Sequence, residues 1–279
     1  DSEKPINRDM AGGLGFDRNR TTILPPLDLL SYATNLELKG HTVELLDPQV
    51  ESLTVEQIKQ LVSQFRPDAV ISTVSLPLID KDISFAKSLK AQLPANCQMF
   101  LKTGISYPPI LERILRDSGC DCCITGECDL MIDQILTGKT HEGTVRLLNG
   151  KYHEEKETFL KNLDQLPILN RELIKNEKYC YPRLGKKTTT MQTSRGCPYS
   201  CGYYCPYPLV QGTKWRAMSA DRILMELKRI VDEEDVHNVF FRDATFTLNK
   251  KRIRNLCQLI GENSLEFSWW CETRIDCLD

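Results

Sequence analysis

Hydrophobic and polar positions follow two different periods along the chain, and these predict helices and strands in turn. Apolar residues spaced three and four apart predict helices at residues 27–38, 55–65, 79–93, 108–117 and 130–136. Short apolar runs between them predict strands at residues 41–46, 68–75, 98–103 and 120–125. Strands that are almost continuously apolar and alternate with helices are typical of a parallel sheet that helices cover on both faces.

The chain ahead of the first helix has a different character. Residues 1–22 are polar and glycine-rich, which predicts a loop. Pro25 and Pro26 begin the first helix, at a position that favours proline. No strong strand pattern precedes that helix.

A second alternating series begins after a predicted hairpin. Asn149-Gly150 separates two strand-like runs within residues 144–156, which is a strong hairpin signal. Later periodic runs predict strands at residues 187–192, 237–241 and 266–271 and helices at residues 220–233 and 251–262. The pattern therefore predicts a domain at residues 1–140, a hairpin and interdomain linker at residues 141–186, and a second α/β domain at residues 187–279.

The run with the clearest chemistry is residues 193–208, with the sequence Thr-Ser-Arg-Gly-Cys-Pro-Tyr-Ser-Cys-Gly-Tyr-Tyr-Cys-Pro-Tyr-Pro. Its prolines and glycines predict a loop directly after a strand. Cys197, Cys201 and Cys205 lie within nine residues of one another. Three thiolates on one loop are suited to a soft metal ion or an iron–sulfur cluster, whereas a disulfide would leave one cysteine over.

This loop resembles the cluster loop of radical S-adenosylmethionine (SAM) enzymes that also carry a cobalamin-binding domain. In that family three cysteines spaced CxxxCxxC ligate three irons of a 4Fe-4S cluster, and SAM binds the fourth iron. The flanking Ser194-Arg195-Gly196 and Pro206-Tyr207-Pro208 agree with the family pattern. The present spacing is CxxxCxxxC, one residue longer. We expect a bulge at Gly202-Tyr203 to absorb the extra residue, since glycine adopts positive φ at little cost.

Composition narrows the classes of function. The 279 residues include 36 basic and 38 acidic side chains, so a basic surface for nucleic acid is not expected. No run of about 18 apolar residues predicts a membrane span, and the N-terminus lacks the apolar core of a signal peptide. Twelve cysteines, nine of them outside the loop, are interpreted as reduced thiols of a cytoplasmic protein. A second metal site at Cys120, Cys122, Cys123 and Cys128 is less favoured, because this run is a predicted strand.

The resemblance extends to the first domain and implies cobalamin. Ligands of open parallel sheets bind beyond the carboxyl ends of the strands. The candidate residues there are Ser75, Gly104, Gly126 and Glu127. The Asp-x-His-x-x-Gly signature of a histidine ligand to cobalt is absent. We therefore predict cobalamin bound without a protein histidine, and the alternative is a flavodoxin-like domain without a ligand.

The resemblance also implies a SAM site in the second domain. Asp243 follows the second predicted strand of that domain, and Glu272-Thr273-Arg274 follows the third. Carboxyl ends of strands face the active side of a (β/α) barrel. Arg274 suits the carboxylate of SAM, because a guanidinium pairs with it through two parallel bonds. Surface ion pairs are the alternative for these side chains.

Taken together, the resemblance implies a Rossmann-like (flavodoxin-like) parallel-sheet domain followed by the first part of a partial (β/α)6 TIM-like barrel. It further implies a strand before Pro25-Pro26 and barrel units beyond residue 279, so that the chain reads as truncated at both ends. The implied activity is cleavage of SAM with cobalamin-dependent methyl transfer to an unactivated carbon of a small-molecule or biosynthetic-intermediate substrate. An external flavodoxin or ferredoxin would supply electrons. The alternatives are a non-catalytic cobalamin-binding protein and an iron–sulfur electron-transfer protein with a degenerate loop.

Overall fold

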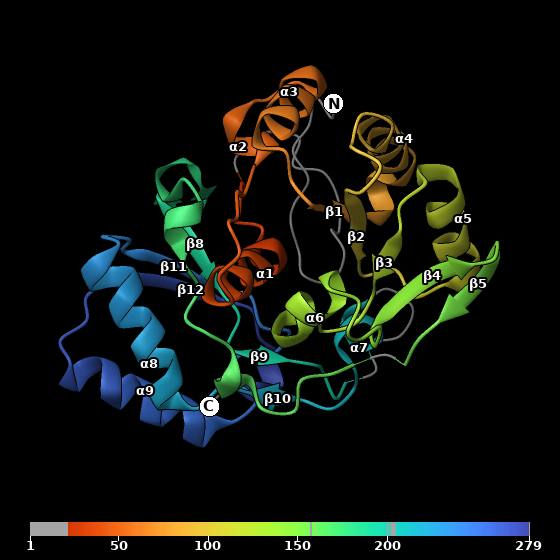
Figure 1. Cartoon of the computed structure of the whole chain (residues 1–279). Helices are drawn as coiled ribbons and strands as arrows, with labels where there is room; N and C mark the ends of the chain where they lie inside the picture. The colour runs from red at the N-terminus through yellow and green to blue at the C-terminus, as the bar shows by residue number, and fades with distance from the viewer. Residues whose placement is uncertain (1–21, 157, 200, 202–204, 279) are drawn as a thin grey trace.

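A computed structural model describes residues 22–156, 158–199, 201 and 205–278. Two α/β units lie side by side (Figure 1), and we call residues 22–156 the first half and residues 188–278 the second half. The prediction of an α/β protein built on parallel strands is confirmed.

The first half is built on a sheet of five strands in sequence order. Strands β1 (Ala69–Val74), β2 (Gln98–Thr103) and β3 (Cys122–Ile124) are parallel. The predicted hairpin is present as β4 (Thr144–Leu148) and β5 (Lys151–Glu154), and β4 pairs antiparallel with β3. The hairpin thus continues the first sheet, and residues 144–154 belong to its edge.

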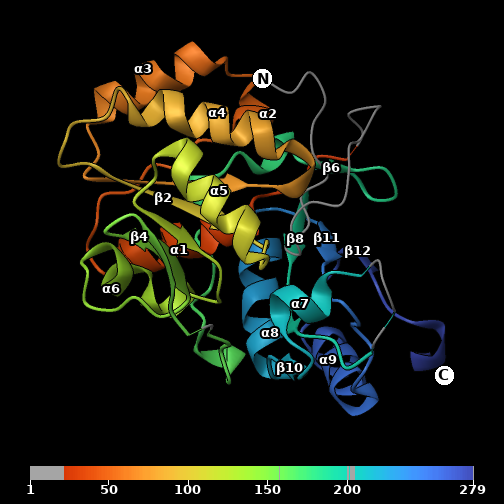
Figure 2. The same ribbon diagram turned by 90° about the vertical axis from the view of Figure 1, so that its right-hand side faces the viewer.

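Helices cover both faces of this sheet, as Figures 1 and 2 show. Helices α4 (Ile79–Lys90) and α5 (Pro108–Ser118) pack on one face, where Met99 and Leu101 of β2 are fully buried. Helices α1 (Leu27–Leu38) and α6 (Ile132–Leu136) pack on the other face, against Phe100. Helix α3 (Val55–Phe65) begins at a capping box between Thr54 and Gln57. Alternate residues of one strand thus enter two separate cores, as a sheet between two helical layers requires.

The second half repeats the scheme with three parallel strands. Strand β11 (Asn238–Phe241) lies between β8 (Thr188–Met191) and β12 (Ser268–Cys271). Helix α8 (Ala220–Lys228), which continues as a π-helical turn over Arg229–Glu233, and helix α9 (Lys250–Glu262) cover it. The chain between the halves includes a short antiparallel pair, β6 (Cys180–Tyr181) with β7 (Gly185–Lys186). Ile23 forms a bridge with Cys180 and so ties the start of the described chain to the segment between the halves.

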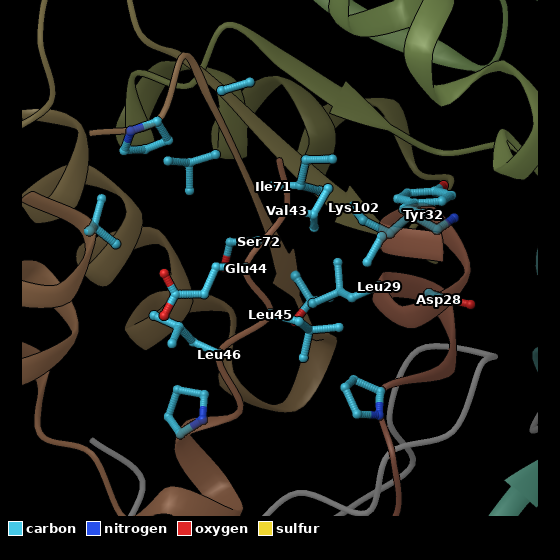
Figure 3. A pocket seen from close by; sticks show the side chains of 18 of the residues that line it. Asp28, Leu29, Tyr32, Val43, Glu44, Leu45, Leu46, Ile71, Ser72 and Lys102 are labelled. Carbon is cyan, nitrogen blue, oxygen red and sulfur yellow. The ribbon is translucent and has the colours of Figure 1, made fainter. Parts of the chain in front are cut away.

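The prediction of a strand at residues 41–46 is wrong, because this segment has no ladder partner among the described residues. The short helix α2 (Pro48–Glu51) follows it. Residues 42–46 and β1 both line a cavity of about 1010 Å³, so they face each other across open space. Figure 3 shows Val43 and Leu45 of this segment together with Ile71 of β1 among the lining side chains. An apolar run alone therefore did not suffice for a strand, since a ladder needs a partner at about 4.8 Å.

The hairpin turn provides a first testable prediction. Asn149 and Gly150 have φ values of 51° and 74°, as a type I′ turn requires. Gly150→Ala should lower the free energy of unfolding by about 1 kcal/mol, because alanine is strained at positive φ. Gly261→Ala in α9 is the matched control, since a Cβ meets nothing within 4 Å at either glycine and only Gly150 has positive φ. The control should raise stability by about 0.5 kcal/mol. Equal effects in urea unfolding would contradict the assignment.

Candidate functional site

The cysteine loop leaves the carboxyl end of β8 through the short strand β9 (Ser194–Arg195) and ends at helix α7 (Tyr207–Gln211). Cys197 is buried, and Cys201 and Cys205 are half-buried. Cys197 and Cys205 belong to one apolar cluster with Tyr199, Tyr207 and Ala244. All three cysteines are free thiols. The fold therefore gathers two of the three predicted ligands in one cluster.

The backbone ahead of Cys197 is held firmly. Gly196 has a φ of 82°, and a Cβ there would lie 2.3 Å from the carbonyl oxygen of Lys214. Strand β9 pairs antiparallel with β10 (Arg216–Ala217), and the amide of Cys197 donates to the carbonyl oxygen of Gly212 at 3.1 Å. Gly196 is thus required by both its φ and its close packing.

The third strand of the second half reaches the same loop. The guanidinium of Arg274, just after β12, lies 3.9 Å from the ring centroid of Tyr199, and its Nη1 is 3.7 Å from Cys201 Sγ. Two hydrogen bonds to Asp276, of 2.9 and 2.8 Å, orient this guanidinium. Glu272 instead accepts a 2.8 Å hydrogen bond from Arg242. Of the predicted SAM residues, Arg274 is the one that faces the cysteines directly.

No group of three His, Cys, Asp or Glu side chains within the described residues surrounds a common metal position. Residues 200 and 202–204, including the predicted bulge at Gly202-Tyr203, lie outside the described residues. The donor set fits an iron–sulfur cluster, because all three candidates are cysteines on one loop and none is used in a disulfide.

Asp243 supports the strand that leads into the loop. Its carboxylate is fully buried and accepts hydrogen bonds of 2.6 Å from the amides of Thr193 and Ser194, and a third from the Thr193 hydroxyl. Arg252 donates to the carbonyl oxygen of Thr193 at 3.1 Å. Burial raises the pKa of Asp243, and the charge of Arg252 opposes that shift. Sequence reasoning placed this carboxylate toward SAM and missed its role as a backbone anchor.

Two buried ion pairs join the halves, and we call them the latch: Asp129 with Arg195, and Glu127 with Arg216. Both acids follow β3 in the first half, and both arginines lie on the β9–β10 ribbon. Arg195 donates to Asp129 at 2.7 and 3.0 Å, and Arg216 donates to Glu127 at 2.7 and 2.8 Å. Each of the four residues is less than 10% exposed. Bidentate pairs of this kind fix orientation as well as distance.

The latch uses the carboxylate of Glu127, one of the predicted cobalamin residues. Its oxygens accept from Arg216 and from the amide of Leu160, at 2.9 Å for the latter. Gly126 beside it packs tightly, since a Cβ there would lie 2.7 Å from Thr158 Oγ1 and 3.1 Å from Gly143 Cα. Gly126 and Glu127 line a space of only about 20 Å³, together with Arg195. That volume is far below that of pockets for organic ligands.

The other two predicted cobalamin residues lie in the large cavity. Ser75 and Gly104, which follow β1 and β2, line the space of about 1010 Å³, and so do Thr190 and Arg242 of the second half. Ser75 is held through its amide and hydroxyl, which lie 2.9 and 3.0 Å from Asp82 Oδ2. The fold thus divides the four predicted residues into two pairs, and one pair shares a cavity with the second half.

No protein-family model matches the chain. The chain is 30% identical over 264 residues to an uncharacterized methyltransferase of Pyrococcus horikoshii, covering 90% of this chain and 56% of that protein. It is 27% identical over 264 residues to the hopanoid C-3 methylase of Methylococcus capsulatus, covering 91% of this chain and 49% of that protein. It is 24% identical over 267 residues to an anaerobic magnesium-protoporphyrin IX monomethyl ester cyclase of Synechocystis, covering 91% of this chain and 52% of that protein.

Among solved structures, the apo form of the cobalamin-dependent S-adenosylmethionine radical enzyme OxsB superposes with a TM-score of 0.69 at 17% identity, covering 90% of this chain and 36% of that one. In sequence the chain thus resembles a methyltransferase, a methylase and a cyclase, and in fold it resembles a cobalamin-dependent radical SAM enzyme. The predicted resemblance is therefore confirmed. The chain spans about half the length of the curated relatives it matches, at 56% and 49% for the first two.

The latch predicts a specific acid sensitivity. Burial would raise the pKa of Asp129, but Arg195 more than offsets this and lowers the pKa from 3.8 to about 2. A carboxylate whose pKa is lower in the folded state stabilises the fold above its unfolded pKa, and loses that effect as the pH falls. Asp129 should therefore contribute about 2 kcal/mol near neutral pH that disappears between about pH 4 and pH 2.

The measurement is the free energy of unfolding by urea at a series of acidic pH values. Asp129→Asn should lower stability at neutral pH and flatten the decline between about pH 4 and pH 2. Asp80→Asn is the matched control, since Asp80 pairs with Arg113 at the exposed surface, where an ion pair contributes little. An unchanged acid slope in Asp129→Asn would refute the assignment.

Proposed function

We propose that this chain carries the cofactor sites of an enzyme that cleaves SAM with a 4Fe-4S cluster and transfers a methyl group, with cobalamin, to an unactivated carbon. The observation that carries the proposal is the loop with Cys197, Cys201 and Cys205, placed at the carboxyl end of β8 in a chain related to methylases and methyltransferases. Parallel α/β folds place their active sites at the carboxyl ends of strands.

The second half would hold the cluster and SAM. Cys197, Cys201 and Cys205 would ligate three irons, and the cluster would supply the electron that cleaves SAM. Arg274 lies beside Cys201 and would pair with the carboxylate of SAM. Glu272 would orient SAM together with Arg242, to which it is hydrogen-bonded. Asp243 would act chiefly by fixing the residues that precede the cysteines, and any contact with SAM would add to that role.

The first half would hold cobalamin at its strand ends. Ser75 and Gly104 line a cavity that also reaches Arg242, so a cofactor there would face the second half. Gly126 and Glu127 would set the shape of the neighbouring loop. His41 also lines this cavity, but its Nε2 lies 2.7 Å from Asp133 Oδ1. Because the sequence lacks Asp-x-His-x-x-Gly, we propose binding without a protein histidine on cobalt, and His41 is the histidine in the cavity lining on which this can be tested.

The partners we propose follow from this chemistry. A radical SAM enzyme needs an external one-electron donor of the flavodoxin or ferredoxin type, and a small organic molecule or biosynthetic intermediate as substrate. No helix within the described residues has the length and apolar character needed to cross a membrane. We propose a cytoplasmic enzyme that does not act on nucleic acid, consistent with the near balance of 36 basic and 38 acidic residues.

One observation favours a second candidate function, an iron–sulfur electron-transfer protein. The CxxxCxxxC spacing, one residue longer than in the radical SAM loop, fits a loop that holds a cluster without SAM chemistry. The two functions differ in their products. Reduced protein incubated with SAM should release 5′-deoxyadenosine and methionine only if the first proposal holds.

Replacing the cysteines tests the cluster site. Anaerobically reconstituted protein should bind about four irons and four sulfides per chain and show the visible charge-transfer absorption of thiolate–iron bonds. The triple variant Cys197→Ala, Cys201→Ala and Cys205→Ala should lose at least about 90% of this iron, since no thiolate of the loop remains. Cys257→Ala, which removes an exposed thiol, is the control and should keep it. Iron retained by the triple variant would refute the assignment.

His41 allows a sharp test of the cobalamin proposal. Protein loaded with cob(II)alamin should give an electron paramagnetic resonance spectrum without nitrogen splitting from a protein histidine. His41→Ala should leave the spectrum unchanged, because the proposal places no protein nitrogen on cobalt. Nitrogen splitting that disappears in His41→Ala would show histidine ligation, and a lack of binding at micromolar concentration would contradict the cobalamin site itself.

A further inference from the structure

The latch joins the loop after β3 to the strand that leads into the cysteine loop. Arg195 is two residues before Cys197 in the chain, and its partner Asp129 lies five residues after the end of β3. Arg195 is held at three points, since it also donates to Gln192 at 3.0 Å. A planar guanidinium held in this way has one orientation, so the position of Asp129 dictates that of Arg195.

The second pair of the latch stiffens the same connection. Arg216 is the residue that pairs with Arg195 across the β9–β10 ribbon. It binds Glu127 and also donates to the carbonyl oxygens of Leu160 and Gln211 at 2.7 and 2.6 Å. Arg195 Nη1 also lies 3.6 Å from Glu127 Oε2, so Arg195 interacts with both acids. Both strands of the ribbon are therefore bound, through their arginine side chains, to one short loop of the first half.

Movement of Arg195 would pass directly to Cys197. The intervening Gly196 has little room to absorb this movement, because a Cβ there would lie only 2.3 Å from the carbonyl oxygen of Lys214. The Gly196 amide donates to Gln211 Oε1 at 3.2 Å, and Gln211 is tied to Arg216. Hydrogen bonds therefore hold every residue from Arg195 to Cys197 in place.

Hydrogen bonds within the first half also hold the loop that carries Glu127 and Asp129. The amide of Glu127 donates to the carbonyl oxygen of Thr158 at 3.0 Å, and Lys102 donates to that of Gly126 at 3.2 Å. Lys102 also lines the large cavity that holds Ser75 and Gly104. Lys102 thus borders the cavity and is hydrogen-bonded to the loop that carries Glu127 and Asp129.

We propose that Arg195 is a positioning residue that couples the two cofactor sites through the latch. A ligand bound at the strand ends of the first half stabilises one position of the cysteine loop, and a cluster on that loop stabilises the strand-end site in return. Coupling of this kind must be reciprocal, since it is a single free energy between two sites. The coupling rests on the proposed function for the identity of its ligands, but the positioning role of Arg195 does not.

The positioning role can be tested on the apoprotein. Cys197 is 5% exposed, so iodoacetamide should alkylate it slowly relative to exposed Cys257. The folded full chain is alkylated, then digested, and mass spectrometry of the peptides gives the rate at each cysteine. Asp129→Asn and Arg195→Lys should each raise the rate at Cys197 by about tenfold or more, because the loop then opens locally. Arg195→Lys keeps the charge and loses the bidentate geometry, so it separates geometry from charge.

The matched control is another buried pair. Arg171 binds Glu226 at 2.9 Å with side chains 0% and 3% exposed, and the pair is remote in sequence from the cysteines. Glu226→Gln removes a buried charge in the same way and should change the Cys197 rate by less than about twofold. Circular dichroism at the assay temperature selects variants that remain folded. An equal rise in Glu226→Gln, or no rise in Asp129→Asn and Arg195→Lys, would overturn the positioning role.

A second arm tests the coupling with hydroxocobalamin as the probe. In the natural sequence, saturating hydroxocobalamin should slow alkylation of Cys197 by at least about threefold, because bound ligand favours the closed loop. In Arg195→Lys this protection should disappear although the cobalamin still binds. Protection that persists in the variant, or none in the natural sequence despite binding, would overturn the coupling. If hydroxocobalamin does not bind at all, the proposed cobalamin site fails, and the coupling to it with it, whereas the first arm still decides the role of Arg195.

Discussion

Two buried arginine–carboxylate pairs fix the first half against the two short strands that flank the cysteine loop. Each pair joins an acid that follows β3 to a basic residue of the β9–β10 ribbon. Removing one member of such a pair leaves a buried charge without its partner, which costs about 3–5 kcal/mol. Because a whole domain is stable by only about 5–15 kcal/mol, the halves cannot separate at this point without a large loss.

This constraint determines which strand ends share a cavity. The residues that follow β1 and β2 belong to the first half, whereas Arg242 follows β11 in the second, and all of them line the space of about 1010 Å³. A cavity with walls from two α/β units is suited to bring two ligands together, one from each sheet. The same arrangement leaves Gly126 and Glu127 in a tightly packed region, where they shape the loop rather than the cavity.

The cysteine loop is also fixed by a few buried contacts. It departs from a strand whose last residues are anchored by the buried carboxylate of Asp243 and by Arg252. Its first turn requires glycine at position 196, and its far side meets Arg274 from the end of β12. Three separate segments of the second half thus converge on one loop, as a site for reactive chemistry requires.

The sequence by itself determined the alternation of helices and strands, the Asn149-Gly150 hairpin and the identity of the cysteine loop, because each depends on residues close together in the chain. The strand predicted from the apolar run at residues 41–46 was wrong. A strand needs a hydrogen-bonded neighbour, and the periodicity of a sequence does not show whether one is present. The roles of Glu127, Asp129, Arg195 and Asp243 were decided by tertiary structure alone. Each forms its buried pairs with residues about 50 to 90 positions away, and such pairing leaves no periodic signal in the sequence.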